Sequence, residues 1–402
     1  MMRRVLSSCG VVVMVLVATL PVSSQGPGQG SAAATTPPLV ITAFNGGPVP
    51  ADWTTPRTPW GEPDLQGVWS SDDATFGVSR GGGRGGGAAP TGLYLNDEQW
   101  AARQKQIQQG VSAGETAIGA FRGDFARRAF RQTSYIVDPP DGIQPQPLPA
   151  ARTRARIGDR GTFGDGPFHT FDDFTNYDRC ITRGIWGSVV RVIYGNGNRI
   201  VQAPGMVALS YEMIHDTRVI YTDGRPHVST GIRQYLGDSR GWWEGDTLVV
   251  ETTNLTDQTS IGANGNGLRH GGKATMVERI RRVANDVVQY QLTVIDPDTY
   301  PRPFTISIPL TPLDGGVLLP YECHEGNGAV RNALSGERAE EGAIAADLAR
   351  GIIRPRRGPQ DDGLGAGAFG GQARPRKGSP QAARAGAPGG RGGAPTGGDQ
   401  ER

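Results

Sequence analysis

The segment that decides the fold reads ATMVERIRRVANDVVQYQLTVI, residues 274–295. Two runs rich in β-branched residues flank Asn285-Asp286, a dipeptide typical of tight turns, so the segment predicts a β-hairpin. From Val288 to Val294 every second residue is apolar and the residues between are polar. This alternation predicts a strand with one face toward a core and the other toward water.

The same pattern recurs from Tyr177 to Glu325, where short β-rich runs are separated by turn residues. The predicted strands are 189–194, 199–203, 207–214, 217–221, 241–244, 247–253, 274–283, 287–295, 304–310 and 317–321. No helical pattern lies between them, which excludes a parallel βαβ sheet and leaves an antiparallel up-and-down barrel or a sandwich. We favour the barrel, because consecutive hairpins indicate a meander and closure protects the edge strands.

The beginning of the chain predicts export. Arg3 and Arg4 precede an apolar run from Val5 to Leu20, and small residues follow up to Ser24. This arrangement is typical of a signal peptide over 1–24, so we expect a periplasmic or extracellular protein. No later stretch approaches the length of a membrane span, and none is expected in the mature chain.

Cysteine usage is consistent with export. Cys9 falls within the predicted signal peptide, which leaves Cys180 and Cys323. An even pair in an oxidising compartment favours a disulfide. Two buried free thiols are the alternative.

The flanking regions predict one β domain with peripheral additions. Residues 25–50 are expected to form a flexible leader, 51–350 a single domain with a Gly/Arg-rich insertion at 77–92, and 351–402 a disordered tail. A Trp-rich segment, 53–69, is expected to lie extended against the core. A few peripheral helices are predicted at 96–110, 121–131 and 335–350.

Charge excludes one class of partner. The formal net charge is +2, but basic residues outnumber acidic ones in 351–402, so the rest of the chain is mildly acidic. A nucleic-acid role needs a basic face with groove-reading or stacking elements, and none is found outside the tail. The separation of His215 and His227 matches no compact zinc spacing, so neither a metal nor another cofactor is expected.

One predicted hairpin concentrates polar side chains. Tyr211, Glu212, His215 and Arg218 bring a phenol, a carboxylate, an imidazole and a guanidinium together. They are candidates for a binding or catalytic site, and the alternative is a solvated surface hairpin. Arg225 and His227 follow the next turn, whose geometry requires neither of them.

Glu278 and Arg279 are adjacent in a predicted strand, so one of them should face the interior. A charge inside a barrel must be paired or solvated, and such groups can orient a ligand or move a proton. A purely structural ion pair with an internal arginine is the equal alternative.

The last predicted strand ends in Tyr321, His324 and Glu325, close in sequence to Cys323. The disulfide would bring these residues near Arg179. An acid, an imidazole and an arginine at a barrel mouth form a workable acid–base set. A salt bridge that merely joins the two chain segments is equally consistent.

Several motifs carry a resemblance. These are YDRC at 177–180, YEMIH at 211–215, DGRPH at 223–227, WEGDTLVV at 243–250 and YEC at 321–323. Together they resemble an uncharacterised family of exported bacterial β-domain proteins, which implies no activity. Gly67-Val68-Trp69 is also similar to the Gly-x-Trp of lipocalins, whose barrels mostly bind small apolar molecules and sometimes catalyse isomerisation, cyclisation or hydration. That similarity implies a ligand cavity only.

The preferred functional hypothesis is a barrel that binds a small, partly apolar molecule. Its pocket candidates are Tyr211, His215, Arg218, Glu278 and Tyr321. The enzymatic alternative is a cofactor-independent lyase, isomerase or hydrolase in which His215 or Glu278 moves a proton and Arg218 or Arg225 stabilises an anion. A third hypothesis is an envelope interaction protein that uses the Trp-rich segment and the basic tail. The oligomeric state stays open.

Overall fold

The computed structural model describes residues 43–44, 47–74, 92–116, 127–154, 156–157, 167–192, 194–262, 265 and 267–353. The predicted signal peptide, most of the predicted leader, nearly all of the predicted insertion at 77–92 and the tail beyond 353 lie outside these residues.

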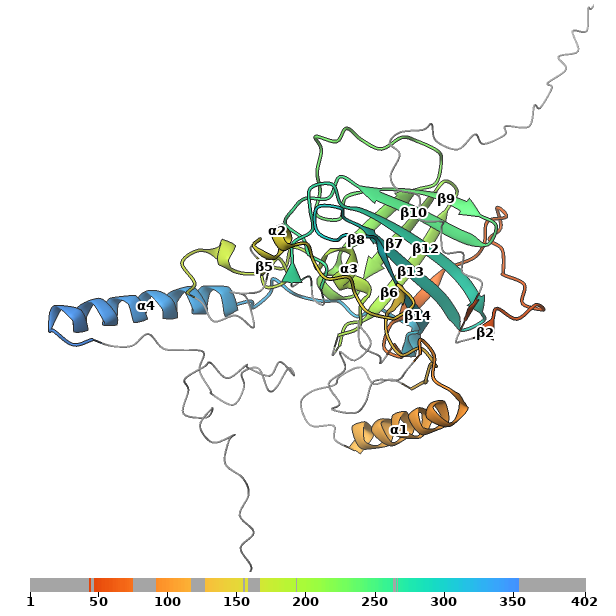
Figure 1. Cartoon of the computed structure of the whole chain (residues 1–402), viewed down its shortest axis with the longest axis horizontal. Helices are drawn as coiled ribbons and strands as arrows, with labels where there is room; N and C mark the ends of the chain where they lie inside the picture. Colours follow the sequence, from red (N-terminus) through yellow and green to blue (C-terminus); the bar gives the residue numbers. More distant parts are fainter. Residues whose placement is uncertain are drawn as a thin grey trace, which may run out of the picture.

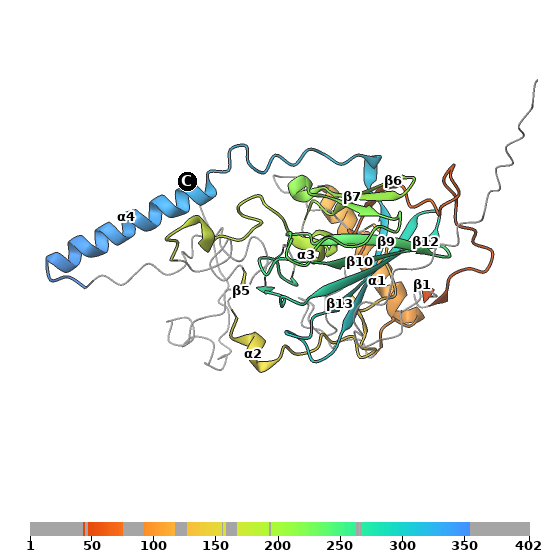
Figure 2. The same ribbon diagram turned by 90° about the horizontal axis from the view of Figure 1, so that it is seen from above.

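In the described part of the chain, the main sheet has ten strands, and all but β4 (Ile136–Asp138) form a closed ring, the body of the fold in Figures 1 and 2. The strands of the ring are β3 (Gly67–Ser70), β6 (Gly197–Ala203), β7 (Met206–Tyr211), β8 (Thr217–Tyr221), β9 (Asp238–Glu244), β10 (Thr247–Thr253), β12 (Thr275–Ala284), β13 (Val287–Ile295) and β14 (Phe304–Pro312). Each pairs with the next in this order, and β14 pairs with β3. The sheet therefore closes on itself, and the predicted β-barrel is confirmed.

The smaller elements lie around this ring. They are β1 (Ala43–Phe44), β2 (Gly47–Pro48), β4 (Ile136–Asp138), β5 (Arg156–Ile157), β11 (Gly267–Leu268), α1 (Asp97–Thr116), α2 (Pro149–Arg152), α3 (Gly184–Val189) and α4 (Ala329–Ala349). Three 3₁₀ turns, η1 (Phe171–Asp173), η2 (Met213–His215) and η4 (Asp314–Gly316), complete the elements discussed below.

Neighbouring strands of the ring run in opposite directions with one exception. All neighbouring strands are antiparallel apart from β8 and β9, which are parallel and meet only at Tyr221 and Arg240. Nine strands cannot alternate direction all the way around a closed ring, so one parallel pair is a geometric necessity. The segment 222–237 supplies it by returning the chain along the length of the barrel.

The interior is apolar over most of its length. In register, Leu248, Ile280, Tyr290 and Ile308 form one row of inward side chains across β10, β12, β13 and β14. All four are at most 2% exposed. Burial of one such side chain stabilises the fold by roughly 1.5–3 kcal/mol, so the interior rows dominate stability.

Helix α3 closes one end of the barrel, and in both views it lies at the end from which α4 projects (Figures 1 and 2). All its residues are buried, and Trp186 packs edge-on against Phe304 of β14 with ring centroids 6.0 Å apart. At the opposite end, Trp53 of the Trp-rich segment donates its indole N–H to the carbonyl of Arg282, 3.1 Å away. That segment lies against the core as predicted.

The expectation of a wet outer face on β13 is wrong for two of its residues. Gln289 and Gln291 are both buried. The amide of Gln289 donates to Ser307 Oγ on β14 (2.7 Å), and Gln132 donates to the carbonyl of Ser307 (2.6 Å). The segment around residue 132 therefore covers this part of the sheet and hydrogen-bonds to its backbone, although Gln291 Oε1 is left without a partner.

Two predicted strands are absent from the sheet. Residues 189–194 were expected to pair with 199–203, but Val189 ends α3 and Val190 is buried behind it. Residues 317–321 follow η4 and form no strand. Because β14 is already paired on both sides, with β13 and β3, the closed ring offers them no free edge.

The predicted helices differ from the observed ones in their bounds. Asn96 and Gln99 form the predicted capping box, with reciprocal backbone-to-side-chain bonds of 3.1 and 2.9 Å, but α1 continues past Gly110 to Thr116. Helix α4 begins six residues before the predicted Ser335 and projects away from the barrel (Figure 1). Of the helix predicted at 121–131, residues 127–131 are not helical and the others lie outside the described residues.

No helix within the described residues is both long and apolar enough to cross a membrane.

Candidate functional site

The middle of the barrel holds a buried ion pair between Arg218 of β8 and Glu278 of β12. Arg218 donates from Nη1 to Glu278 Oε2 and from Nη2 to Oε1, both at 2.5 Å. Tyr290 donates to Oε1 of the same carboxylate (2.7 Å). Glu278 is therefore the interior member of the Glu278–Arg279 pair, as strand alternation required of one of them.

The surrounding polar groups complete this network. Arg218 Nη1 also lies 3.2 Å from Ser239 Oγ and 3.1 Å from Thr252 Oγ1, and Nη2 lies 3.3 Å from the hydroxyl of Tyr211. Burial raises the pKa of Tyr211 to about 12, so its hydroxyl stays protonated. Glu278 is 0% exposed, and its two oxygens already accept three hydrogen bonds. This geometry favours a structural pair over an acid or base that meets a substrate.

Arg279 lies on the outer face of the same strand. It donates to Glu244 Oε2 of β9 from both Nη atoms, at 2.9 and 2.8 Å. Its side chain is buried although it faces outward, because Glu244 and its neighbours cover it. Arg279 does not share a site with Glu278.

Glu212 follows β7 and is half-buried. Its Oε2 accepts from the backbone N–H of Gly197 (3.0 Å), and its own N–H donates to the carbonyl of Gly197 (2.8 Å). Burial raises the pKa of this carboxyl. These bonds join the end of β7 to the start of β6.

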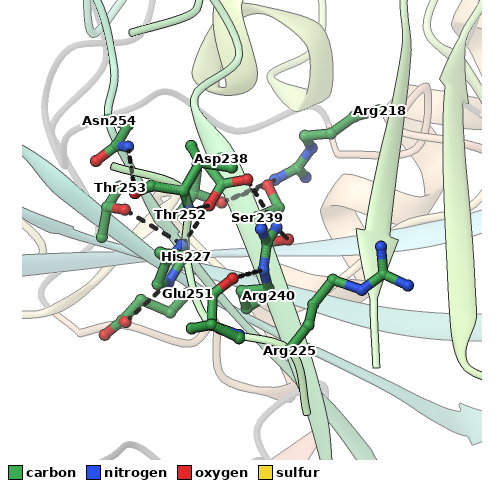
Figure 3. A network of polar contacts seen from close by, with 12 residues as sticks. Arg218, Arg225, His227, Asp238, Ser239, Arg240, Glu251, Thr252, Thr253 and Asn254 are labelled. Atoms are coloured by element: carbon green, nitrogen blue, oxygen red, sulfur yellow. Dashed lines mark hydrogen bonds and ion pairs between the residues drawn. The ribbon is translucent and has the colours of Figure 1, made fainter. Parts of the chain in front are cut away.

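His227 lies in the segment that connects β8 to β9 (Figure 3). Its Nδ1 is 2.7 Å from Asp238 Oδ2, and its Nε2 is 3.2 Å from Glu251 Oε1. Asp238 also accepts from Arg240 Nη1 (2.7 Å) and from the N–H of Val228 (3.0 Å). The ring thus holds the connecting segment against β9 and β10.

Arg225 extends away from the His227 ring (Figure 3). It pairs with Asp223 in the adjacent turn, at 2.5 Å, and its guanidinium lies 3.8 Å from the centroid of the Tyr221 ring. The two predicted site residues of this segment, Arg225 and His227, therefore do not converge.

A pocket of about 650 Å³ opens beside the α3 end of the barrel. It lies between residues 168–178, residues 321–327 and the first turns of α4, and we call it the rim pocket. Four aromatic side chains line it: Phe168, Phe174, Tyr177 and Tyr321. The rings of Phe168 and Phe174 stack with centroids 4.7 Å apart. The sequence analysis expected a cavity inside the barrel. The rim pocket instead lies outside the barrel interior.

The predicted disulfide between Cys180 and Cys323 is present at this pocket, with Cα atoms 5.7 Å apart. It fixes residues 177–180 beside residues 321–323, so the hydroxyls of Tyr177 and Tyr321 lie 3.2 Å apart and hydrogen-bond. Tyr321, a pocket candidate from the sequence, lines the rim pocket.

His215 is exposed in the turn between β7 and β8, and its Nδ1 lies 2.9 Å from the carbonyl of Tyr321. It is therefore next to the rim pocket and separate from Arg218 and Glu278 in the interior. Glu325 is exposed, and Arg179 donates to Asp172 and Asn176, both at 2.8 Å. The expected acid–imidazole–arginine set at the barrel mouth is not formed.

The backbone around the rim pocket contains strained residues. Cys180, Ile214 and His215 have φ angles of 57°, 67° and 46°. Positive φ is unfavourable for residues with a Cβ and is a genuine outlier for a β-branched residue such as Ile214. Strain of this kind gathers at functional sites when surrounding contacts impose it.

Sequence reasoning missed several residues of this end of the barrel. Phe168, Phe171, Phe174 and Tyr177 recur every third residue, which is a signal for an aromatic surface. Arg183, directly before α3, was also missed, because nothing in the local sequence shows that it is buried.

No family model, curated protein or solved structure matches this chain. Within the described residues, no group of three or more His, Cys, Asp or Glu side chains is arranged to hold a metal ion.

Proposed function

We propose that this chain is an exported protein that binds a small, partly apolar molecule in the rim pocket. The observation that carries the proposal is the pocket itself. Its volume of about 650 Å³ falls in the range of small-molecule sites, and such sites combine an apolar lining with a few polar groups.

The lining meets both requirements. Phe168 and Phe174 supply apolar ring surface, and Ala333 of α4 contributes a small side chain to the opposite wall. Tyr177 and Tyr321 add two hydroxyls that can donate to a ligand. A ligand with an apolar body and one polar group would fit this distribution.

An exported location is part of the proposal. The Cys180–Cys323 disulfide supports it, since such bonds persist mainly in oxidising compartments. The disulfide also ties together two walls of the pocket, which reduces the conformational entropy that ligand binding must restrict.

The geometry favours binding over the enzymatic alternative. Glu278 is enclosed by Arg218 and Tyr290. His215 contacts the backbone carbonyl of Tyr321, and among the described residues it hydrogen-bonds to no titratable side chain. Neither arrangement supplies a positioned acid–base pair.

A neutral fluorescent probe tests the proposal. N-phenyl-1-naphthylamine, excited directly, should show saturable 1:1 binding to the purified chain. Ala333→Trp fills the pocket and should abolish this signal, whereas Ala339→Trp, at an exposed position of the same helix, should leave it unchanged. Absence of saturable binding in the wild type, or equal binding by both variants, would refute the proposal.

A further inference from the structure

Arg183 is a buried cation without a charged partner. Its side chain is 1% exposed, and both Nε and Nη2 lack a hydrogen-bond partner. Within the described part of the chain, no carboxylate forms an ion pair with it. A buried charge in this state is costly, so a compensating group is expected.

The other buried arginines show how this protein normally handles such charges. The described residues include three buried arginines: Arg183, Arg218 and Arg279. Arg218 forms a bidentate ion pair with Glu278, and Arg279 forms an ion pair with Glu244. Among the described residues, Arg183 is the one of the three that forms no ion pair with an acid.

The titratable groups that interact with Arg183 are three tyrosine phenols. Tyr177, Tyr194 and Tyr321 interact electrostatically with Arg183, and the hydroxyls of Tyr177 and Tyr321 hydrogen-bond to each other. Burial raises the pKa of Tyr177 and that of Tyr321, so these hydroxyls stay protonated and neutral. Burial lowers the pKa of Arg183 to about 10, which leaves the guanidinium charged at neutral pH. The charge is therefore not balanced by these two phenols.

The phenols also connect Arg183 to the rim pocket. Tyr177 and Tyr321 line the pocket, and Arg183 does not. Both tyrosines interact electrostatically with the guanidinium of Arg183, and their hydroxyls hydrogen-bond to each other at 3.2 Å. A ligand oxygen that accepted from both hydroxyls would replace this bond and approach Arg183.

We propose that the ligand of the rim pocket carries a carboxylate, which pairs with Arg183 while an apolar body lies against Phe168 and Phe174. This inference deepens the proposed function and rests on it. Guanidinium–carboxylate bonds are charge-assisted and gain strength in buried surroundings. The unpaired Arg183 would then be a preformed anion receptor.

The outer part of the pocket opposes this preference. Asp178 and Glu322 also line it, so charge at the mouth favours a cation. Asp178 already accepts from the hydroxyl of Thr175 (2.8 Å), and Glu322 is exposed and screened by solvent. The buried charge of Arg183 should therefore outweigh them.

The test uses three probes with one shared body: 3-phenylpropanoate, 3-phenylpropanamide and 3-phenylpropylammonium. Isothermal titration of the wild-type chain at pH 7 should give roughly tenfold or tighter binding of the acid over the amide, with the ammonium weakest. Arg183→Met should reduce acid binding to the level of the amide and leave amide binding unchanged within about twofold.

Two control variants and a second measurement separate the charge of Arg183 from general effects of substitution. Arg179→Met removes a nearby arginine that is already paired with Asp172, so the acid preference should persist. Arg183→Lys keeps the charge and should keep part of the preference. If Arg183→Met does not fold, the wild type decides alone: the acid should raise Tm more than the amide or the ammonium at equal concentration.

Each result separates the two proposals. Binding of N-phenyl-1-naphthylamine without any acid preference would overturn the carboxylate inference and leave the binding function standing. A preference for the ammonium, or an acid preference that survives Arg183→Met, would also overturn it. Failure of every probe to bind would refute the proposed function as well.

Discussion

Replacing Glu278 by Gln tests whether the interior ion pair supports the fold. The substitution keeps the shape and one acceptor for Tyr290, but it leaves Arg218 charged and 4% exposed without a counterion. Removing one member of a buried pair costs about 3–5 kcal/mol. The two guanidinium bonds of 2.5 Å to a carboxylate that is 0% exposed place this site at the upper end of that range.

The measurement is urea denaturation at pH 7, followed by tryptophan fluorescence and extrapolated linearly to water. Glu244→Gln is the matched control, because it breaks the outer pair with Arg279 and Glu244 is 42% exposed. That change should cost less than about 1 kcal/mol. The double variant Arg218→Met with Glu278→Leu should lose less than Glu278→Gln alone, since it leaves no unpaired charge. Equal losses for Glu278→Gln and Glu244→Gln would refute this reasoning.

Two further predictions concern pH and redox state. Burial lowers the pKa of His270, so the unfolded chain takes up a proton more readily and the free energy of unfolding should fall as pH drops below about 6.5. His270→Gln should flatten this slope between pH 7 and 5 in urea titrations, and an unchanged slope would contradict the assignment. Loss of the Cys180–Cys323 disulfide, which spans a sequence separation of 143, should lower the free energy of unfolding by on the order of 4–5 kcal/mol at most. Unfolding of the double Ser variant measures this, and a loss below about 1 kcal/mol would argue against the loop-entropy account.

The sequence predicted the strands best where hairpins are local. The turn at Asn285-Asp286 and the alternation on β13 identified that hairpin correctly, because both signals act between neighbouring residues. The error at 189–194 has a different origin. Its β-branched residues favour a strand. The buried helix α3 occupies the end of the barrel instead, and the packing of Trp186 against Phe304 outweighs the local preference.

The candidate site was harder to predict. Alternation placed one of Glu278 and Arg279 inside the barrel, and the structure identifies Glu278 as that residue. The link between Tyr177 and Tyr321 depended on the disulfide, which the cysteine count could suggest but not prove. The burial of Arg183 follows only from the position of α3, and no sequence signal carries that information.

The parallel contact between β8 and β9 bears on how the chain folds. Within the described residues, strands β3 to β8 and strands β9 to β14 are two groups of antiparallel neighbours that pair with each other at two seams. One seam is the single pair of Tyr221 with Arg240, and the other is the short pairing of β14 with β3. The pairings from β6 to β8 and from β9 to β14 join strands that are close in sequence. Strand β3 must instead bring Gly67 to Ile200 of β6 and Trp69 to Pro312 of β14, which closes much longer loops. We therefore expect the pairings of β3 to form late in folding, and the one-residue seam between β8 and β9 to be a weak point of the ring.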